Sequence, residues 1–596
     1  VMERWVRLRH CGDEGVIVVR QAYSANWCLP RDQGWRLRYL QGGHLVETQL
    51  TETALRPGKF VLESRRGITS HQANPWFALD RGELAAEEHG EVWSGALAWS
   101  GSWKLVTEVT PAGNLHVTGG YNEFDSPCEL APGAELVLPV FAGLYGNQGM
   151  GGVSREWHAY QLRHVLASSG RTGGSPSFPA LGRPGALGGT GEVAPAPRPV
   201  LYNSWEATYF DVDERSQTRL AELAAEMGVE LFVVDDGWFT GRVSDRAGLG
   251  DWTTDPAKFP NGLDPLIERV EKLGMRFGLW VEPEMVNADS MLYRDHPDWV
   301  FHFPNRQRSE KRNQLVLNLG RPDVADWVHA SIDRLVSEHS ISFLKWDMNR
   351  HFSEPGWPEQ AGHNPERAWI DHTRHLYEIL DRLRADHPGL EIESCSGGGG
   401  RVDLGILSRA EQVWPSDNTD ASDRISIQDG FTHAYAPMTM MCWVTDSPNP
   451  ITGRRLPLSY RFHVAMAGSL GIGGDLLTWP EEERAEAADL VAAYKAIRPL
   501  VQYGRLYRLA SFRQGPVTAS QYLAGDGAEL AVLAWWRPRP FGVWTSRLRL
   551  AALDPAARYR DAATGVVYGG GLLMHSGLPL PSGLDYGSML THLIRI

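Results

Sequence analysis

Acidic residues recur in this sequence at the ends of short apolar runs. The four clusters are Asp235-Asp236, Glu282-Pro283-Glu284, Lys345 to Arg350 and Asp417 to Asp420. A buried carboxylate is costly unless it is paired or hydrogen-bonded. Any single acid could be an ion-pair partner or a helix cap. Four clusters at equivalent positions instead predict a site for acid–base or nucleophilic chemistry.

Asp347 and Asp417 differ in their sequence neighbours. Side chains two apart on a strand point the same way, so Lys345, Asp347 and Asn349 share one face. The lysine would keep the Asp347 carboxylate ionised, as a nucleophile requires. Asp417 has no adjacent basic residue and lies beside Trp414, so we expect desolvation to raise its pKa and keep it protonated. Two unlike carboxyls near tryptophan predict glycoside hydrolysis.

Two further features have competing interpretations. The segment Ser394–Arg401 (SCSGGGGR) contains four glycines, which suit either a tight turn or close backbone approach to a ligand. Cys395 within it could be a papain-like nucleophile, but no His or Asn is placed by sequence to activate it. Arg312 lies far from any expected strand end, so its residue type alone indicates a surface charge.

The elements that position these residues alternate between strand and helix from Pro199 to about Leu500. Eight strand candidates are VLYNSW, ELFVVDDGW, RFGLWVEPEM, SFLKWDMN, LEIESCS, EQVWPSD, APMTMMCWV and GSLGIGG. Helical faces with a 3.6-residue period lie between them, such as the face of Leu220, Leu223 and Met227. No GxGxxG or phosphate loop follows the first strand. The pattern favours a (β/α)8 barrel over an open sheet, with active residues at the carboxyl ends of the strands.

The regions that flank the barrel differ in pattern. Residues 1–165 show short alternating stretches separated by Gly, Pro and Asn, which predict a β-sandwich with a terminal helix near residues 154–166. Residues 166–198 are rich in Gly, Pro, Ser and Ala and predict a linker or long loop. The barrel is expected over residues 199–503, and an antiparallel β-domain over 504–596.

Composition sets the broad class. The 596 residues are 42% hydrophobic and 22% charged with a net charge of -14, which excludes a largely disordered chain and general attraction to nucleic acid or anionic membranes. No apolar run approaches the ~18–20 residues of a membrane span. Five widely spaced cysteines and the absence of an apolar leader at the start predict a reducing cytoplasm. The 23 tryptophans indicate large aromatic cores or stacking platforms for sugars.

Nine segments, in their order along the chain, resemble glycoside hydrolase family 36, the bacterial α-galactosidases. They are NSWEATYFD, LFVVDDGWF, LGDW, FPNGL, FGLWVEPEMV, RNQLVLNL, KWDMNRH, ESCSGGGGR and PSDNTDASDR. The resemblance runs from about residue 64 to the end of the chain. It implies a central (β/α)8 barrel, a shortened N-terminal β-supersandwich and a C-terminal antiparallel β-domain. The segment 168–199 looks like an insertion relative to the family.

By this resemblance, Asp347 matches the nucleophile and Asp417 the acid/base of a retaining mechanism. The galactose pocket of the family maps onto Trp205, Asp235, Asp236, Trp280, Arg312, Lys345, Asn349, Cys395, Gly397 and Gly398. Asp235 and Asp236 would hold the hydroxyls at the C4 and C6 end of the sugar. The Cys395 loop would abut the 2-position and leave room for a hydroxyl.

The resemblance therefore implies an exo-α-galactosidase that releases terminal α-1,6-linked galactose from melibiose- or raffinose-type sugars, with neither metal nor organic cofactor. Two alternatives share the fold: an α-N-acetylgalactosaminidase and a transgalactosylase similar to raffinose synthases. A non-catalytic sugar-binding protein and a structural surface protein agree less well with the two aspartates. The family pattern also implies a homo-oligomer, specifically a tetramer, in which a neighbouring subunit helps to close the pocket.

Overall fold

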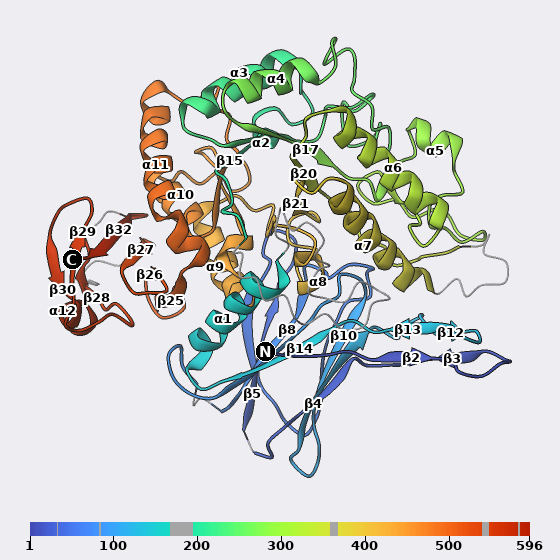
Figure 1. The fold of residues 1–596 in the computed structure, drawn as a ribbon, viewed down its shortest axis with the longest axis horizontal. Coiled ribbons are helices and arrows are strands. Elements are labelled where there is room, and N and C mark those ends of the chain that lie inside the picture. The colour runs from blue at the N-terminus through green and yellow to red at the C-terminus, as the bar shows by residue number, and fades with distance from the viewer. Residues whose placement is uncertain (33, 83–84, 167–194, 358–366, 539–546, 582–584) are drawn as a thin grey trace.

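The computed structural model describes residues 1–32, 34–82, 85–166, 195–357, 367–538, 547–581 and 585–596. Three parts follow one another along the chain: β-sheets at the N-terminus, a mixed α/β middle part, and a sheet at the C-terminus, drawn in blue, green to orange, and red (Figure 1). Most of the predicted linker at 166–198 lies outside the described residues, which resume at 195.

Two antiparallel sheets form the N-terminal part. The first has the strand order β1 (Met2–Arg4), β14 (Phe141–Gly146), β9 (Val92–Leu97), β8 (Ala73–Arg81), β5 (Trp35–Gln41) and β6 (Gln49–Ala54). The second has the order β4 (Ala25–Leu29), β11 (Leu115–Tyr121), β10 (Trp103–Val109) and β7 (Gly58–Glu63). Inward residues of both sheets, such as Trp35 and Leu105, share one hydrophobic core. The predicted β-sandwich is therefore confirmed.

Smaller elements complete this part. Strand β3 (Ile17–Val19) pairs with β12 (Cys128–Leu130), and β2 (Arg7–Arg9) pairs with β13 (Glu135–Val137). Helix α1 (Gly149–Tyr160) and the π-helix η1 (Gln161–Val165) lie where the sequence predicts a terminal helix.

Eight parallel strands form the barrel of the middle part. Their order is β22 (Gln412–Val413), β21 (Glu391–Ser394), β20 (Phe343–Trp346), β17 (Arg276–Val281), β16 (Leu231–Val234), β15 (Leu201–Asn203), β24 (Ser469–Ile472) and β23 (Met441–Val444). A parallel bridge between Val413 and Met440 joins the two end strands. Strand β16 is buried along its whole length, because helices cover the barrel outside and side chains fill it inside. All eight predicted strands are present, and the predicted barrel is confirmed.

Helices surround these strands. They are α2 (Trp205–Thr208), α3 (Glu214–Glu226), α4 (Asp264–Lys272), α6 (Pro322–Glu338), α7 (Ala368–Asp386), α8 (Leu404–Leu407), α9 (Ala421–Ala434), the 3-10 helix η3 (Pro437–Thr439), α10 (Leu458–Ala465) and α11 (Glu481–Tyr503). Helix α3 begins where Asp213 accepts a hydrogen bond from the backbone N–H of Ser216 (2.7 Å). It buries the predicted face that contains Leu220 and Leu223 against the barrel.

An excursion separates β17 from β20. Strand β18 (Met285–Asn287) pairs antiparallel with β19 (Gln314–Val316), and helix α5 (Met291–Asp295) lies between them. The turn that leads into β19 contains Arg312 and Asn313, both with positive φ (54° and 58°). This hairpin brings a distant stretch of sequence to the carboxyl end of the barrel.

The C-terminal part is an antiparallel sheet, as predicted. Its strand order is β25 (Arg505–Ala510), β26 (Val517–Leu523), β27 (Glu529–Trp536), β32 (Ser588–Arg595), β29 (Arg558–Asp561) and β30 (Val567–Gly569). Strands β28 (Arg547–Leu548) and β31 (Leu578–Pro579) form a separate pair, and α12 (Gly570–His575) follows β30.

Two loops of the N-terminal part pack against the barrel. Thr48 Oγ1 donates a hydrogen bond to the carbonyl of Ile427 (2.8 Å), and a Cβ on Gly430 would lie 1.6 Å from the carbonyl oxygen of Thr48. In the second loop, the Ser70 N–H donates to the carbonyl of Gly400 (2.8 Å). The N-terminal part therefore reaches the loops that follow the barrel strands.

Candidate active site

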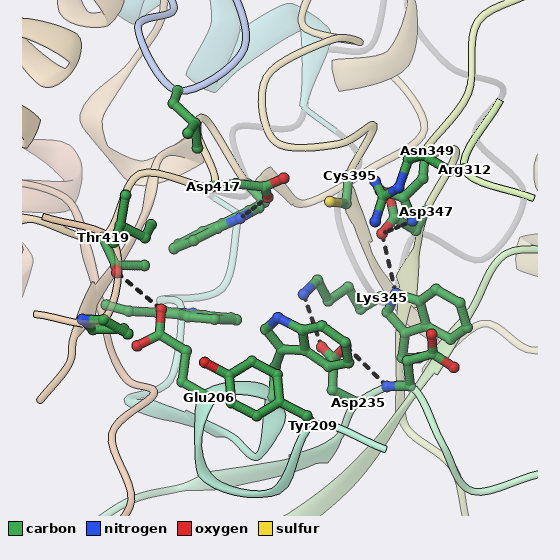
Figure 2. Close-up of a pocket in the computed structure, with 18 residues that line it drawn as sticks. Glu206, Tyr209, Asp235, Arg312, Lys345, Asp347, Asn349, Cys395, Asp417 and Thr419 are labelled. Atoms are coloured by element: carbon green, nitrogen blue, oxygen red, sulfur yellow. Dashed lines mark hydrogen bonds and ion pairs between the residues drawn. The ribbon is translucent and has the colours of Figure 1, made fainter. Parts of the chain in front are cut away.

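A cavity of about 280 Å³ opens among the loops at the carboxyl ends of the barrel strands (Figure 2). Except for the two glycines, every residue predicted for the site lines this cavity. These residues are Trp205, Asp235, Asp236, Trp280, Arg312, Lys345, Asp347, Asn349, Cys395 and Asp417. The strand alternation inferred for Lys345, Asp347 and Asn349 is confirmed, because all three face it.

Four N–H donors surround the carboxylate of Asp347. Trp280 Nε1 (3.1 Å) and Asn349 Nδ2 (2.9 Å) donate to Oδ2. The backbone N–H groups of Met348 (2.8 Å) and Gly397 (3.3 Å) donate to Oδ1. Hydrogen bonds of this kind stabilise the ionised carboxylate. The protein therefore holds Asp347 in a fixed orientation, as a nucleophile requires.

Lys345 interacts with a different acid from the one that the sequence suggests. Its Nζ forms a buried ion pair with Asp235 Oδ2 (2.8 Å), which also accepts a hydrogen bond from Asn203 Nδ2 (2.7 Å). Burial lowers the pKa of Lys345, but the charges of Asp235 and other acids outweigh it and raise the pKa. The long lysine side chain reaches Asp235 at the end of β16, and the direct stabilisation of Asp347 comes from N–H groups instead.

Asp236 is also paired. Arg242 donates to both of its oxygens, from Nε to Oδ1 (2.9 Å) and from Nη2 to Oδ2 (2.7 Å). Burial raises the pKa of Asp236, and the charge of Arg242 opposes this shift. Asp236 therefore presents to the cavity a carboxylate that an arginine orients.

The environment of Asp417 differs from the prediction. Trp414 Nε1 donates to Oδ1 (3.0 Å), as the neighbouring sequence suggests, but His44 Nε2 lies 3.0 Å from Oδ2. Burial raises the pKa of Asp417; the hydrogen bond and charge of His44, with the charges of Lys345 and Arg312, outweigh it and lower the pKa. The predicted upward shift is therefore wrong, because these basic groups lie far from Asp417 in sequence.

The glycine turn after β21 lies between the two aspartates. Gly397 and Gly398 have φ values of 50° and 80°, which favour glycine. The Gly397 N–H contacts Asp347, and a Cβ on Gly398 would lie 2.7 Å from the backbone nitrogen of Asp417. The glycines contact the two aspartates and do not themselves line the cavity.

Cys395 is 2% exposed and lines the cavity wall. Burial raises the pKa of its thiol well above the usual value, and the charge of Asp347 adds to the shift. A neutral buried thiol is a poor nucleophile. This environment argues against the papain-like alternative.

Arg312 lies at the cavity rather than on a remote surface, although its side chain stays open to solvent. Its position depends on the β18–β19 hairpin, which no local pattern around KRNQLVLN reveals. Like Arg312, the lining residues Leu45 and Tyr209 have positive φ (71° and 45°). Strained backbone of this kind persists where the surrounding structure fixes it, which is common at functional sites.

Eight further lining residues were not predicted as site residues, although Trp414 was noted as a neighbour of Asp417. They are Leu45, Glu206, Tyr209, Trp414, Thr419, Trp443, Pro450 and Ile451. Glu206 directly follows Trp205, so its position in NSWE was an available signal. Nothing near Leu45 signals a role, because this residue comes from the N-terminal part.

Glu206 is a second unusual acid in this cavity. Its Oε1 accepts a hydrogen bond from Thr419 Oγ1 (2.8 Å). Its Oε2 is buried and has no hydrogen-bond partner among the residues that the structure describes. Burial raises the pKa of Glu206 to about 8, so the carboxyl is protonated at neutral pH.

Some of the clustered acids have structural roles. Glu284 is fully buried and accepts hydrogen bonds from Arg401 Nη1 (2.8 Å) and Trp346 Nε1 (2.9 Å). Asp420 accepts from the N–H groups of Ser422 and Asp423 and caps α9. The ion-pair and cap interpretations are therefore correct for these two acids, and Asp347 and Asp417 remain available for chemistry.

Among the described residues, no cluster of three or more His, Cys, Asp or Glu side chains could hold a metal ion. No helix in the described ranges is long and apolar enough to cross a membrane. All five cysteines carry free thiols.

Comparison with family models assigns most of the chain. The glycosyl hydrolase family 36 N-terminal domain matches residues 1–131, melibiase matches residues 190–504, and the glycosyl hydrolase family 36 C-terminal domain matches residues 517–593. The chain belongs to glycoside hydrolase family 36. The suspected resemblance is therefore confirmed, and it covers all three parts of the fold.

Relatives of this family 36 chain are α-galactosidases. It is 40% identical to α-galactosidase AgaA of Geobacillus stearothermophilus, over 100% of this chain and 78% of that protein. It is 34% identical to α-galactosidase Mel36A of Lactobacillus acidophilus, over 99% and 77% of the two chains. Crystal structures of AgaA variants with raffinose and with stachyose match with TM-scores of 0.92 and 0.93 at 37% identity, covering 100% of this chain and 79% of theirs. The predicted enzyme class, an α-galactosidase, is confirmed.

Proposed function

We propose that this family 36 enzyme is a retaining exo-α-galactosidase that removes terminal α-1,6-linked galactose from melibiose-, raffinose- and stachyose-type sugars. The main support is that Asp347 and Asp417, from separate strands, line one cavity in unlike surroundings. The cavity of about 280 Å³ lies near the lower end of the ~300–1,000 Å³ usual for small-molecule pockets, which suits a single sugar unit.

In this mechanism Asp347 attacks the anomeric carbon while Asp417 gives a proton to the leaving oxygen. The C–O bond to the leaving sugar breaks and a covalent galactosyl-enzyme forms. Asp417 then takes a proton from water, whose oxygen displaces Asp347 and restores the original configuration. The four N–H donors around Asp347 favour its role as nucleophile and leaving group.

The other lining residues supply recognition. We assign Asp235 and Asp236 to the hydroxyls at the C4 and C6 end, because Lys345 and Arg242 hold their carboxylates in place. The remaining contacts with the sugar come from Trp205, Trp280, Arg312, Asn349 and Cys395, and the turn of Gly397 and Gly398 supports Asp347 and Asp417 from outside the cavity. Cys395 would face the 2-position, where it leaves room for a hydroxyl.

An anomer-resolved NMR time course with p-nitrophenyl α-galactoside and melibiose tests this proposal. The wild type should release α-galactose first, and Asp347→Ala should give no turnover. Asp417→Ala should lose about 10²–10⁴-fold on melibiose, where protonation of the leaving group matters, and much less on the activated aryl substrate. β-Galactose as the first product would contradict retention. Faster cleavage of the 2-acetamido analogue would favour an α-N-acetylgalactosaminidase.

We also propose a reducing cytoplasm as the compartment and a homo-tetramer as the assembly. The free thiols of all five cysteines agree with a reducing compartment. The tetramer rests on the family pattern. Light scattering during size-exclusion chromatography measures the assembly directly, and a monomeric mass would contradict it.

A further inference from the structure

A loop of the N-terminal part contacts the proposed acid/base from outside the barrel. His44 Nε2 lies 3.0 Å from Asp417 Oδ2. The next residue, Leu45, accepts a hydrogen bond from Asn418 Nδ2 at its carbonyl (3.1 Å) and lines the cavity. The histidine is therefore built into the site although it belongs to another domain.

The loop that bears His44 is fixed at several points. Leu45 and Thr48 adopt positive φ (71° and 51°). Thr48 Oγ1 donates to the carbonyl of Ile427 (2.8 Å), and Ser416 Oγ donates to Glu47 Oε2. Non-glycine residues keep such backbone angles only where their surroundings fix them. The side chain of His44 is still 54% exposed, so it remains in contact with solvent protons.

The charges in this contact indicate that one proton is shared. The hydrogen bond to Asp417 raises the pKa of His44. Burial raises the pKa of Asp417, but the hydrogen bond and charge of His44 help to lower it. Two interacting groups titrate as a pair. Below the raised pKa of His44 the pair therefore holds one proton, and that proton resides mainly on the imidazole.

We propose that His44 is a positioning residue that stores the proton which Asp417 delivers to the glycosidic oxygen. This inference rests on the proposed function of Asp417. Transfer of the Nε2 proton to Asp417 gives a neutral imidazole and a neutral acid. When the C–O bond breaks, its electron pair stays on the leaving oxygen, which takes the proton from Asp417. In the second step Asp417 takes a proton from water, and the pair regains its single proton.

Other titratable and charged groups face this pair. Glu47, His71 and Arg312 face His44, and Lys345, Arg312, Glu47 and Glu206 face Asp417. Burial raises the pKa of Glu47 to about 7, so this acid is the main competitor in a neutral pH profile. Burial lowers the pKa of His71 and keeps its ring neutral. The test must therefore separate His44 from Glu47.

The pH dependence of kcat/KM for melibiose and for p-nitrophenyl α-galactoside provides that test. In His44→Gln the shared proton is lost, so the alkaline limb for melibiose should move about one unit lower. At pH values above both limbs the rate should then be about tenfold lower than in the wild type. The aryl substrate, which needs little protonation, should change less than about threefold. His116→Gln is a matched control, because His116 lies on β11 of the same domain and contacts Cys28.

Two results would overturn the inference: an alkaline limb that does not move in His44→Gln, or an equal loss on both substrates. Movement of the limb in Glu47→Gln but not in His44→Gln would also overturn it and assign the titration to Glu47. These outcomes differ from failure of the proposed function, in which the wild type itself would not hydrolyse α-galactosides.

Discussion

Replacing Gly398 by alanine tests whether the turn after β21 holds Asp417, the proposed acid/base, in place. Gly398 has a φ of 80°. An added Cβ would lie 2.7 Å from the backbone nitrogen of Asp417 and 2.9 Å from Glu47 Oε1. Because ordinary contacts need about 3.5 Å, the turn or the Asp417 backbone must shift by roughly 0.5–1 Å.

Two separate costs follow from this geometry. The left-handed backbone alone costs an alanine about 1 kcal/mol of stability. A displacement approaching 1 Å should lower kcat on melibiose by about 10- to 100-fold, or about 1.4–2.8 kcal/mol of barrier. The activated aryl galactoside should lose less, because its leaving group needs little help from Asp417.

Gly274→Ala is the matched control. Gly274 has a φ of 84°, and its added Cβ would have no other described atom within 4 Å. This variant therefore carries the backbone cost without the clash. Thermal unfolding and kcat on both substrates should be measured for the two variants. Equal kcat values on melibiose would refute the reasoning that Gly398 sets the position of Asp417.

Two further predictions concern buried acids. Glu206→Gln should keep the wild-type rate within about threefold at pH 7, because the carboxyl with a pKa of about 8 is already neutral, and the ratio of its rate to the wild-type rate should change between pH 7.5 and 9, where only the wild type ionises at this position. Burial raises the pKa of Glu284, but Arg401 and hydrogen-bond donors outweigh it and lower it to about 2. The stability that the ionised Glu284 carboxylate gives to the folded protein is thus complete above about pH 4.3, the pKa of a glutamate in the unfolded chain. This stability is lost as the pH falls toward 2. Glu284→Gln should cost about 3–5 kcal/mol at pH 7 in chemical unfolding, since it leaves the Arg401 charge unpaired, and an unchanged midpoint would contradict this.

The barrel and much of its site could be predicted from local patterns. Strands such as LFVV are apolar throughout because both faces are buried, and strand alternation places Lys345, Asp347 and Asn349 together. The positions of Asp235 and Trp280 follow from the rule that active residues gather at the carboxyl ends of barrel strands.

Long-range contacts explain what the sequence could not reveal. The direction of the pKa shift at Asp417 depends on His44, Lys345 and Arg312, none of which is adjacent in sequence. Nothing in the stretch GGHLVE marks His44 or Leu45, because their roles arise only when the N-terminal part packs on the barrel. Residue type alone predicts a surface charge at Arg312, but the β18–β19 hairpin places this residue at the cavity.

The close fit of Thr48 on Gly430 has a consequence for anyone who divides this enzyme into pieces. An excised barrel would retain Asp347 with its N–H donors but would lose the imidazole beside Asp417. Heating that separates the two domains should slow cleavage of unactivated galactosides by at least the loss expected for His44→Gln, while the barrel remains folded. The rate on melibiose thus measures, in effect, whether the two domains are still joined.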